Sequence, residues 1–308
     1  MSVIGIDTSN YTTSIAYFDG ESGVNCSRLL PVKPGELGLR QSDAVFAHTK
    51  SLPDLSGRLF SNAEVGKITA VGVSTRPRAV EGSYMPCFMV GYSHAKLLSD
   101  ALGVPLVEVS HQQGHVAASL WSAGHLELMD EPHLAWHLSG GTTELLLVEP
   151  EGKNVKCTKI GGTTDISAGQ LIDRTGVMLD LPFPAGKHVD ALSKEAVLKE
   201  TFKVKCPGME FSLSGVQNKV QQFHQKNGVP AETAAFALRC VASAVYQATQ
   251  NALKAYSGLK VVFSGGVASN SMLREVIAPL NPIFCEPQYS TDNAMGVAVL
   301  THRYTQEG

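Results

Sequence analysis

Short apolar runs separated by small polar turns open the chain and recur near its middle. Residues 4–17 have the pattern of a strand, a tight turn and a returning strand, and residues 135–148 repeat it. In both segments a Thr-Thr pair follows the turn, at Thr12-Thr13 and at Thr142-Thr143. Because self-similarity reflects architecture, the repeat predicts a duplicated domain, with two unrelated hairpins as the alternative.

The spacing of apolar residues predicts further strands and helices. Residues 68–74 and 259–264 are short apolar runs of the kind that form buried strands. Apolar residues three and four positions apart predict a helix over 233–256, and a second helix is expected over 214–226. We interpret residues 150–158 as a polar surface turn. The mixture of buried strands and amphipathic helices predicts the α/β class.

The chain has 308 residues, which is enough for two domains of ordinary size. Its composition, with 44% hydrophobic and 17% charged residues, excludes a disordered chain. We expect an N-terminal domain of residues 1–110, joined by the C-terminal segment 292–308, and a second domain of residues 111–291. No low-complexity linker separates them, so we expect the two domains to meet over a cleft that holds a site.

The charge balance provides no global field that would hold a polyanion. Because the net charge is −3 and the pI is near 6.4, a nucleic-acid partner would need a local basic patch or a helper subunit. The densest basic candidate is Arg76-Pro77-Arg78, which could contact phosphates together with Arg28, Arg40 and Lys50. Scattered surface charge is the alternative.

Cysteine usage and the first residues indicate a reducing compartment. The six cysteines are dispersed without a CxxC pair, so neither a zinc ribbon nor a disulfide framework is predicted. The chain opens on Val3-Ile4-Gly5-Ile6 without a basic region before it, and no run of eighteen apolar residues occurs. We therefore expect a cytoplasmic protein without a membrane segment.

His111 and His115 follow the strand-like segment 105–110 and begin a predicted helix. A spacing of four places both imidazoles on one helical face, where they can share a metal ion; surface or capping histidines are the alternative. Asp292 precedes a last predicted helix over 294–301, where it would be a cap or a third, oxygen ligand. A zincin protease requires HExxH, and because the intervening residues here are QQG, protease chemistry is disfavoured.

Two glycine-rich segments, Ser139-Gly140-Gly141 and Ser264-Gly265-Gly266, each end an apolar run. Glycines at such positions let backbone amides approach a phosphate closely. An ordinary tight turn explains either segment alone, but two of them in a candidate duplication favour nucleotide binding. Neither is a Walker loop.

Three carboxylates, Asp165, Asp173 and Asp190, fall between the two glycine-rich segments. Asp173 lies on a helix predicted over 167–179, and Asp190 follows a Pro-Gly turn. Carboxylates beside a nucleotide commonly accept hydrogen bonds from ribose hydroxyls, whereas helix capping or exposure to water is the alternative.

Taken in order, these segments resemble the tRNA adenosine threonylcarbamoyltransferase family, formerly called glycoprotein endopeptidases. The hairpin that begins GIDTS is followed by HxxxH, SGGxT, a DxxAGxxxDR-like helix, a PxPxGxxxD turn, FSxSG, SGGVxxNxxLR and STDN. Each motif is weak alone, but together they keep the family order from Ile4 to about Val299. The resemblance implies an α/β, actin/Hsp70/sugar-kinase-like fold with two duplicated α/β domains around a nucleotide cleft.

The resemblance also implies a metal site and a nucleotide site. His111, His115 and Asp292 match the family's ligands for one divalent metal, iron or zinc. Asp7 is the remaining acid of the first hairpin, and we expect it to act in catalysis. The nucleotide positions comprise a backbone loop, two ribose carboxylates, a glycine against the nucleotide and a polar residue at the adenosine: His137, Leu138, Ser139, Gly140, Gly141, Asp173, Asp190, Gly186 and Asn270.

The family transfers a threonylcarbamoyl group from threonylcarbamoyl-AMP to the exocyclic amine of the adenosine beside the tRNA anticodon. A divalent metal with open positions can orient the donor and polarise an oxygen, so no covalent nucleophile is needed. By resemblance we expect an acyltransferase with ATP or threonylcarbamoyl-AMP as ligand and tRNA as acceptor. Accessory proteins of the threonylcarbamoyladenosine pathway are the expected partners.

Some positions depart from the family pattern and keep two other functions open. Tyr11 and Thr12 stand where the family usually has two acids, RPR at 76–78 replaces GPG, Thr142 replaces the histidine of SGGHT, and residues 293–296 also differ. One alternative is a divergent paralogue that binds ATP or an acyl adenylate as a scaffold or regulatory subunit. The other is an ATPase or phosphotransferase of the same fold. The metal-ligand set favours the transferase over the phosphotransferase, whereas the lost acids favour the scaffold.

Overall fold

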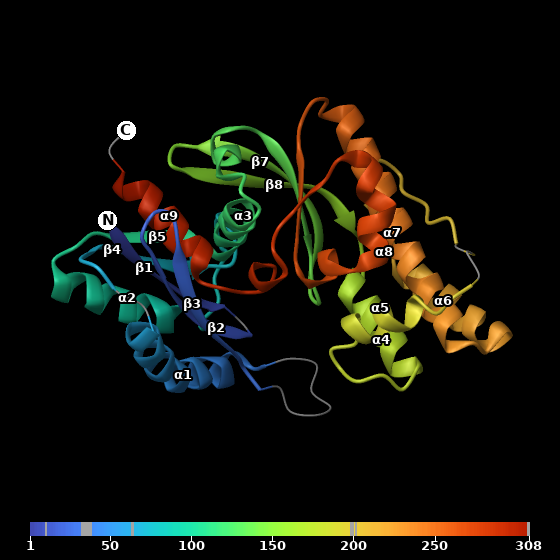
Figure 1. The fold of residues 1–308 in the computed structure, drawn as a ribbon, viewed down its shortest axis with the longest axis horizontal. Coiled ribbons are helices and arrows are strands. Elements are labelled where there is room, and N and C mark those ends of the chain that lie inside the picture. The colour runs from blue at the N-terminus through green and yellow to red at the C-terminus, as the bar shows by residue number, and fades with distance from the viewer. Residues whose placement is uncertain (10, 32–38, 63–64, 198–199, 201, 307–308) are drawn as a thin grey trace. The chain divides into compact units, whose positions relative to one another are not determined.

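The computed structural model describes the chain apart from residues 10, 32–38, 63–64, 198–199, 201 and 307–308. Contacts within the chain group it into two compact units (Figure 1). The first comprises residues 1–131, 149–157 and 292–308, and the second comprises residues 132–148 and 158–291. The domain boundaries expected from the sequence, 1–110 with 292–308 and 111–291, stay a prediction.

The sheet of the first unit has the strand order β3-β2-β1-β4-β5. β1 pairs antiparallel with β2 and parallel with β4, and β4 pairs parallel with β5. The carboxyl ends of β1, β4 and β5 therefore lie at one edge of the sheet, where ligands bind in open α/β sheets. The strands are Ser2–Ser9 (β1), Thr12–Phe18 (β2), Gly23–Leu29 (β3), Ile68–Arg76 (β4) and Leu106–Ser110 (β5).

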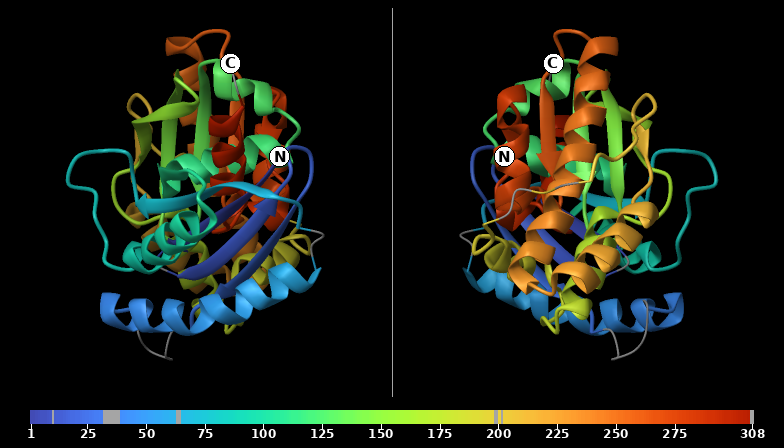
Figure 2. Two further views of the ribbon diagram at one scale, coloured as in Figure 1. Left: turned by 90° about the vertical axis from the view of Figure 1, so that its left-hand side faces the viewer. Right: turned by 90° about the vertical axis from the view of Figure 1, so that its right-hand side faces the viewer.

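Helices cover both faces of this sheet, which explains why every residue of β1 and β2 is buried. α1 (Gln41–Asn62) and α2 (Phe88–Leu102) pack on one face, and α3 (His111–Ser122) and α9 (Met295–Thr305) on the other (Figure 1). α9 approaches β1 closely because Gly5 has no side chain; a Cβ atom there would lie 2.6 Å from the amide nitrogen of Ala298. The loop between β4 and α2 extends away from the sheet (Figure 2).

The sheet of the second unit repeats this strand order. Its order is β11-β10-β6-β7-β8-β9, so β8-β7-β6-β10-β11 corresponds to β3-β2-β1-β4-β5, with β9 added at one edge. In each sheet the first hairpin is antiparallel and the next strand joins in parallel. This shared order is what a duplicated domain predicts. The strands are His133–Leu138 (β6), Thr143–Glu151 (β7), Asn154–Thr163 (β8), Glu210–Phe211 (β9), Val261–Ser264 (β10) and Ile283–Phe284 (β11).

The core of the second unit forms between its sheet and α7. Trp136 of β6 is fully buried there, and its indole Nε1 donates a hydrogen bond to Oγ1 of Thr249 at 2.9 Å. The helices of this unit are Ala168–Met178 (α4), Gly186–Ser193 (α5), Ser214–Asn227 (α6), Pro230–Ala255 (α7) and Ser271–Ile277 (α8). Short 3-10 turns occupy Leu126–Asp130 (η1), Gly266–Ser269 (η2), Ala278–Leu280 (η3) and Pro287–Tyr289 (η4).

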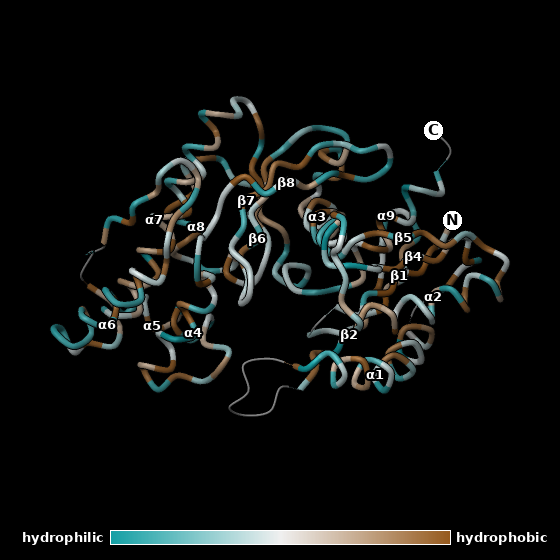
Figure 3. Tube along the Cα trace, turned by 180° about the vertical axis from the view of Figure 1, so that it is seen from behind, coloured by the Kyte–Doolittle hydropathy of each residue, from teal (hydrophilic) through white to brown (hydrophobic). Residues whose placement is uncertain are grey.

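The hydrophobic pattern predicted many of these elements. The helices predicted over 233–256 and 214–226 are α7 and α6, and the predicted strands 68–74 and 259–264 are β4 and β10. Figure 3 shows hydrophobic segments in the strands β1, β4 and β5, as their apolar runs predict. Asn10, which the sequence pattern placed in the first hairpin, lies outside the described residues. No helix in the described part of the chain is long and apolar enough to cross a membrane.

The prediction of a surface turn over residues 150–158 is wrong. The turn is confined to the residues around Gly152, which has φ 62°, and Asn154–Thr163 forms the strand β8. The polar residues of this segment misled the prediction because a strand can expose one face to water without losing its pairing.

Candidate functional site

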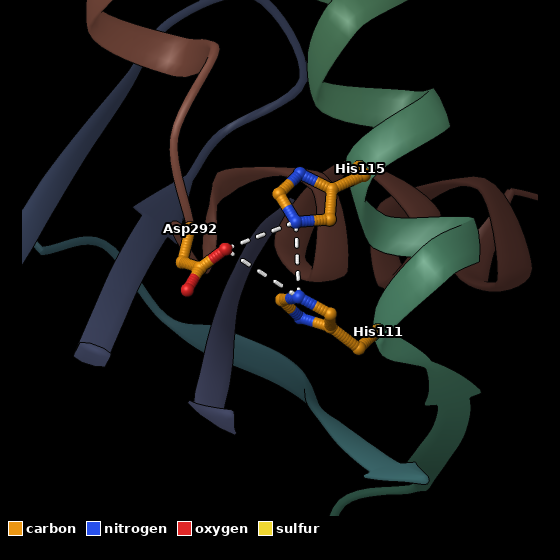
Figure 4. A group of neighbouring side chains, drawn as sticks. All are labelled: His111, His115 and Asp292. Atoms are coloured by element: carbon orange, nitrogen blue, oxygen red, sulfur yellow. Dashed lines mark hydrogen bonds and ion pairs between the residues drawn. The ribbon is translucent and has the colours of Figure 1, made fainter. Parts of the chain in front are cut away.

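Two imidazoles and one carboxylate point at a common position in the first unit (Figure 4). β5 runs directly into α3, where Ser110 caps the helix and the first turns carry His111 and His115. The Nε2 atoms of the two histidines lie 2.9 Å apart. Oδ1 of Asp292 lies 3.2 Å from Nε2 of His115 and 3.5 Å from Nε2 of His111. The structure therefore brings together the three residues predicted as metal ligands.

This donor set suits a divalent transition metal. Zinc binds imidazole nitrogen and carboxylate oxygen at about 2.0–2.2 Å, and tetrahedral geometry then separates the ligand atoms by about 3.3 Å. The separations of 2.9, 3.2 and 3.5 Å bracket that value. Two imidazoles and one carboxylate also suit iron and leave coordination positions open. The side chain of Asp292 is 28% exposed, so the site has a side open to solvent.

Asp7 contacts His111 on the side away from this common position. Asp7 is buried in β1, and its Oδ1 accepts hydrogen bonds from Nδ1 of His111 at 3.1 Å and from the hydroxyl of Ser74 in β4. Histidine ligands commonly donate their second ring N–H to a carboxylate in this way, which leaves Nε2 free to bind a metal. Asp7 therefore contacts one of the predicted metal ligands. Sequence reasoning did not single out Ser74. The feature that could have indicated it is that Ser74 is a small polar residue near the end of an apolar strand.

Burial and charge oppose each other in this cluster, since burial disfavours every charged form. Burial raises the pKa of Asp7, but the neighbouring His111 outweighs it and the pKa is lowered. Burial lowers the pKa of His111, but Asp7 and Asp292 outweigh it and raise the pKa to about 10. Both histidines hold the pKa of Asp292 well below its usual range against the effect of burial. The two carboxylates thus make the position between the side chains favourable for a cation.

The predicted phosphate loop lies in the second unit, between β6 and β7. The amide of Ser139 donates to the carbonyl of Thr142 at 2.8 Å, which closes the turn around Gly140 and Gly141. A Cβ atom on either glycine would meet no atom within 4 Å, so that face of the loop is open. Behind the loop α4 begins, and the hydroxyl of Ser167 donates to the carbonyl of Gly140 at 2.6 Å. Glycine amides and a helix N-terminus together favour an anion.

The second glycine-rich segment lies beside this loop. β10 pairs in parallel with β6, with Ser264 opposite His137, so both segments follow neighbouring strand ends. Oγ of Ser264 lies 3.4 Å from Nδ1 of His137. Gly265 has φ 89°, and a Cβ atom there would overlap the carbonyl of Leu138, so only glycine fits this position.

Asp173 lies on α4, as predicted, and fixes the start of α5. Its Oδ1 accepts a hydrogen bond from the amide of Ala185 at 2.8 Å, directly before Gly186. Burial raises the pKa of Asp173, against the opposite effect of that amide. A Cβ atom on Gly186 would meet no atom within 4 Å, so there is open space beside Gly186, the first residue of α5.

Asp190 and Asn270 contact each other directly. The side-chain amide of Asn270 donates to Oδ1 of Asp190 at 2.8 Å, and the amide and hydroxyl of Ser271 donate to the same oxygen at 3.0 and 2.8 Å. Oδ1 of Asn270 accepts from the amide of Leu273 at 3.0 Å and thereby caps α8. Oδ2 of Asp190 lies 3.5 Å from Nζ of Lys194. Two predicted nucleotide-site residues that are 80 positions apart in the sequence are therefore in direct contact.

Asp165, a third candidate for ribose, is engaged elsewhere. Its carboxylate accepts hydrogen bonds from the hydroxyls of Ser212 and Ser214 and from the amide of Leu213, which links the end of β8 to the start of α6.

Among the basic residues considered for phosphates, Arg28 forms an ion pair with Asp54 at 3.1 Å.

Solved structures share this fold. The chain is similar to HypF from T. kodakarensis, with a TM-score of 0.64 and 13% identity over 98% of this chain and 47% of that one. It is also similar to a ROK hexokinase from Thermus thermophilus, with a TM-score of 0.53 and 15% identity over 100% of both chains. Identity this low shows the fold alone. The protein thus has an actin/Hsp70/sugar-kinase-like fold, as the family resemblance implied.

Sequence relatives give the family. The chain is 33% identical to the tRNA N6-adenosine threonylcarbamoyltransferase of Carboxydothermus hydrogenoformans over 98% of this chain and 92% of that protein. It is 30% identical to the enzyme of the same name from Thermosipho africanus over 100% of this chain and 96% of that protein. A family model, TsaD: tRNA N6-adenosine threonylcarbamoyltransferase, matches residues 37–299. The chain belongs to this family of acyltransferases, and the predicted resemblance is confirmed.

Proposed function

We propose that the protein transfers a threonylcarbamoyl group from threonylcarbamoyl-AMP to the exocyclic amine of the adenosine beside the tRNA anticodon, in a metal-dependent reaction. In this step a bond forms between the amine nitrogen and the carbamoyl carbonyl carbon. The bond from that carbon to the phosphate oxygen breaks, AMP leaves and one proton is released. Family membership supports the reaction class. The convergence of His111, His115 and Asp292 is the observation that carries the metal dependence.

His111, His115 and Asp292 would hold one divalent metal, iron or zinc, through two Nε2 atoms and a carboxylate oxygen. Such an ion supplies Lewis-acid polarisation of a donor oxygen when it is bound. The protein's own contribution is to fix the ligands. Asp7 orients the ring of His111, and the hydroxyl of Ser74 orients Asp7. We therefore propose that Asp7, which we expected to be catalytic, works by positioning His111.

For ATP or the AMP part of the donor, we propose the loop Ser139-Gly140-Gly141, with the strand end His137-Leu138, as the phosphate contact. The open faces of its glycines and the start of α4 behind it favour an anion. Binding the leaving group in place would supply orientation for the transfer.

The sugar and base would be contacted by the other predicted residues of the second unit. Asp173 and Asp190 would accept hydrogen bonds from ribose hydroxyls, and Gly186 would leave room for the nucleotide. Because Oδ1 of Asp190 already accepts three hydrogen bonds, Oδ2 is the atom that a hydroxyl would contact. Asn270 would contribute to adenosine binding indirectly, because its side-chain amide holds the ribose-binding carboxylate of Asp190 in place.

We further propose that accessory proteins of the pathway supply the donor and part of the tRNA affinity, and that the reaction takes place in the cytoplasm. The net charge of −3 supports the need for helpers, since a protein with a net negative charge does not attract a polyanion over long range.

Reconstitution tests this function. The purified chain is mixed with a donor-forming enzyme, ATP, bicarbonate, threonine and unmodified tRNA, and the tRNA is then digested and analysed by mass spectrometry. We expect threonylcarbamoyladenosine with the metal-loaded protein and its loss in His111→Ala. His125→Ala is the matched control, because His125 is a partly exposed histidine paired with Glu127, outside the metal-ligand set.

The result also decides between the transferase and its alternatives. If ATP still binds but no modified adenosine forms with the wild-type protein, the scaffold or regulatory function is favoured. If metal analysis finds neither iron nor zinc and His111→Ala retains full activity, the proposed role of the metal site is wrong.

A further inference from the structure

The loop that connects β4 to α2 begins beside the metal-ligand set. Arg76, the last residue of β4, is the register partner of Ser110 in β5, the residue directly before His111. The amide of Gln112 donates a hydrogen bond to the carbonyl of Pro77 at 3.0 Å, which ties the start of the loop to the first turn of α3. The start of this loop therefore lies next to the first turn of α3, which carries His111.

The loop borders a shallow pocket of about 390 Å³ that is open to solvent and is lined by Arg76, Ala79, Val80, Glu81, Gly82 and Ser83. Within the part of the chain that the structure describes, the guanidinium of Arg76 makes no hydrogen bond or ion pair. A half-buried arginine at the rim of a pocket is a good ligand for a phosphate, because its planar fork donates several N–H groups at once. Glu81 lines the same pocket and opposes an anion there.

The loop also carries two large side chains that are exposed to solvent instead of packing in a hydrophobic core. The side chain of Tyr84 is 64% exposed, and that of Val80 is 57% exposed. The loop is held in shape by its own bonds, from the amide of Arg78 to Oγ of Ser83 at 2.9 Å and from the amide of Ser83 to the carbonyl of Val80 at 3.2 Å. A free aromatic ring on an ordered loop offers a platform on which an unpaired base can stack.

We propose that the loop from Arg76 to Tyr84 binds an unpaired stretch of RNA beside the acceptor adenosine. Arg76 contacts a backbone phosphate in the pocket, and Tyr84 stacks on a base. This inference rests on the proposed function, because the adenosine beside an anticodon lies in a single-stranded loop. It also explains how a chain with a net charge of −3 holds a polyanion, since a few local contacts replace a global field.

Binding of RNA alone tests the proposal. The probe is a fluorescein-labelled, unmodified anticodon stem–loop, titrated with the metal-loaded full chain and followed by fluorescence anisotropy at several salt concentrations. Tyr84→Ala is expected to weaken binding at least about fivefold, the loss typical of one stacked base. Arg76→Gln is expected to weaken binding and to reduce the slope of log K against log salt by about 0.7, the value for one phosphate contact on a single strand. Glu81→Gln is expected to tighten binding.

Exposed residues of the same type elsewhere serve as matched controls. Arg58→Gln on α1 and Tyr304→Ala on α9 should bind RNA like the wild type. Thermal melting of each variant checks that it is folded. Tyr84→Ala should fold normally because the side chain of Tyr84 is mostly exposed. The proposal is overturned if the wild type does not bind the probe, or if Arg76→Gln and Tyr84→Ala bind it as tightly as the wild type.

The modification assay separates this inference from the proposed function. If the wild type binds RNA through this loop but forms no modified adenosine, the loop is correct and the transferase proposal fails. If the wild type modifies tRNA while Arg76→Gln and Tyr84→Ala bind RNA unchanged, the transferase stands and the loop is wrong.

Discussion

Gly296 of α9 and Gly114 of α3 approach each other backbone to backbone. A Cβ atom on Gly296 would overlap the carbonyl oxygen of Gly114 and lie 2.8 Å from the amide nitrogen of Ala118. Gly114 directly precedes His115, and Gly296 follows Asp292 by four positions. This contact therefore sets how closely the helix with the imidazoles approaches the segment with the carboxylate.

Gly296→Ala is expected to lower the free energy of unfolding by about 1–3 kcal/mol, because the added methyl group must push two helices apart. The metal content of the purified protein should fall with it. Gly114→Ala is the matched control: its Cβ atom would lie 3.4 Å from the side chain of Val297, an ordinary contact, and Ala is favoured over Gly in a helix by about 1 kcal/mol. Urea unfolding and elemental analysis measure both effects. Equal stability of the two variants would contradict this account of the helix contact.

Asp7→Asn is expected to lower the affinity for iron or zinc about 10–100-fold, because an amide supports the Nδ1–H tautomer of His111 less well than a carboxylate. Titration against a competing chelator measures this affinity without any need for activity. Asp54→Asn, on the exposed surface of α1, is the control and should bind metal normally. Unchanged affinity in Asp7→Asn would show that Asp7 does not position His111.

Asp165→Asn tests a pH-dependent contribution to stability in the second unit. Burial raises the pKa of Asp165, but the hydrogen bonds from Ser212, Ser214 and Leu213 outweigh it and lower the pKa to about 2. Because this value lies below the unfolded value of about 3.9, the carboxylate stabilises the fold above about pH 4 and loses this effect as the pH falls toward 2. Solvent screening limits the contribution to roughly 1 kcal/mol. In urea unfolding, the gap between wild type and variant should be largest near pH 7 and shrink at pH 3; a constant gap would contradict the assignment.

Asn270→Ala is expected to destabilise the protein by about 1 kcal/mol even without nucleotide, because it removes the cap of α8. ATP affinity should fall as well, since Asp190 loses the amide that holds it. The control is Ser269→Ala at the neighbouring exposed position. If the melting temperature without nucleotide is unchanged and only ATP binding falls, Asn270 contacts the adenosine directly instead of acting through Asp190.

Local patterns predicted the elements and some of the site. The spacing of four between His111 and His115 places both rings on one helical face in any α-helix, so this pair followed from the sequence. α6 also followed, since it ends at Gly228, which adopts the left-handed conformation with φ 71°. The strand β8 did not follow, because the polarity of its first residues is compatible with a turn or with a strand that has one exposed face.

The sequence by itself determined the α/β elements, the repeated hairpin and the motif order that identifies the family, because periodicity, turn residues and motifs are properties of short stretches. Only the tertiary structure decided which distant residues meet. His115 and Asp292 are 177 positions apart, and Asp7 and His111 are 104 positions apart. Their contacts depend on how parallel strands align their carboxyl ends and on how closely α3 and α9 pack, and no local pattern encodes those distances. The same packing brings Asp7, which we expected to act in catalysis, into contact with His111.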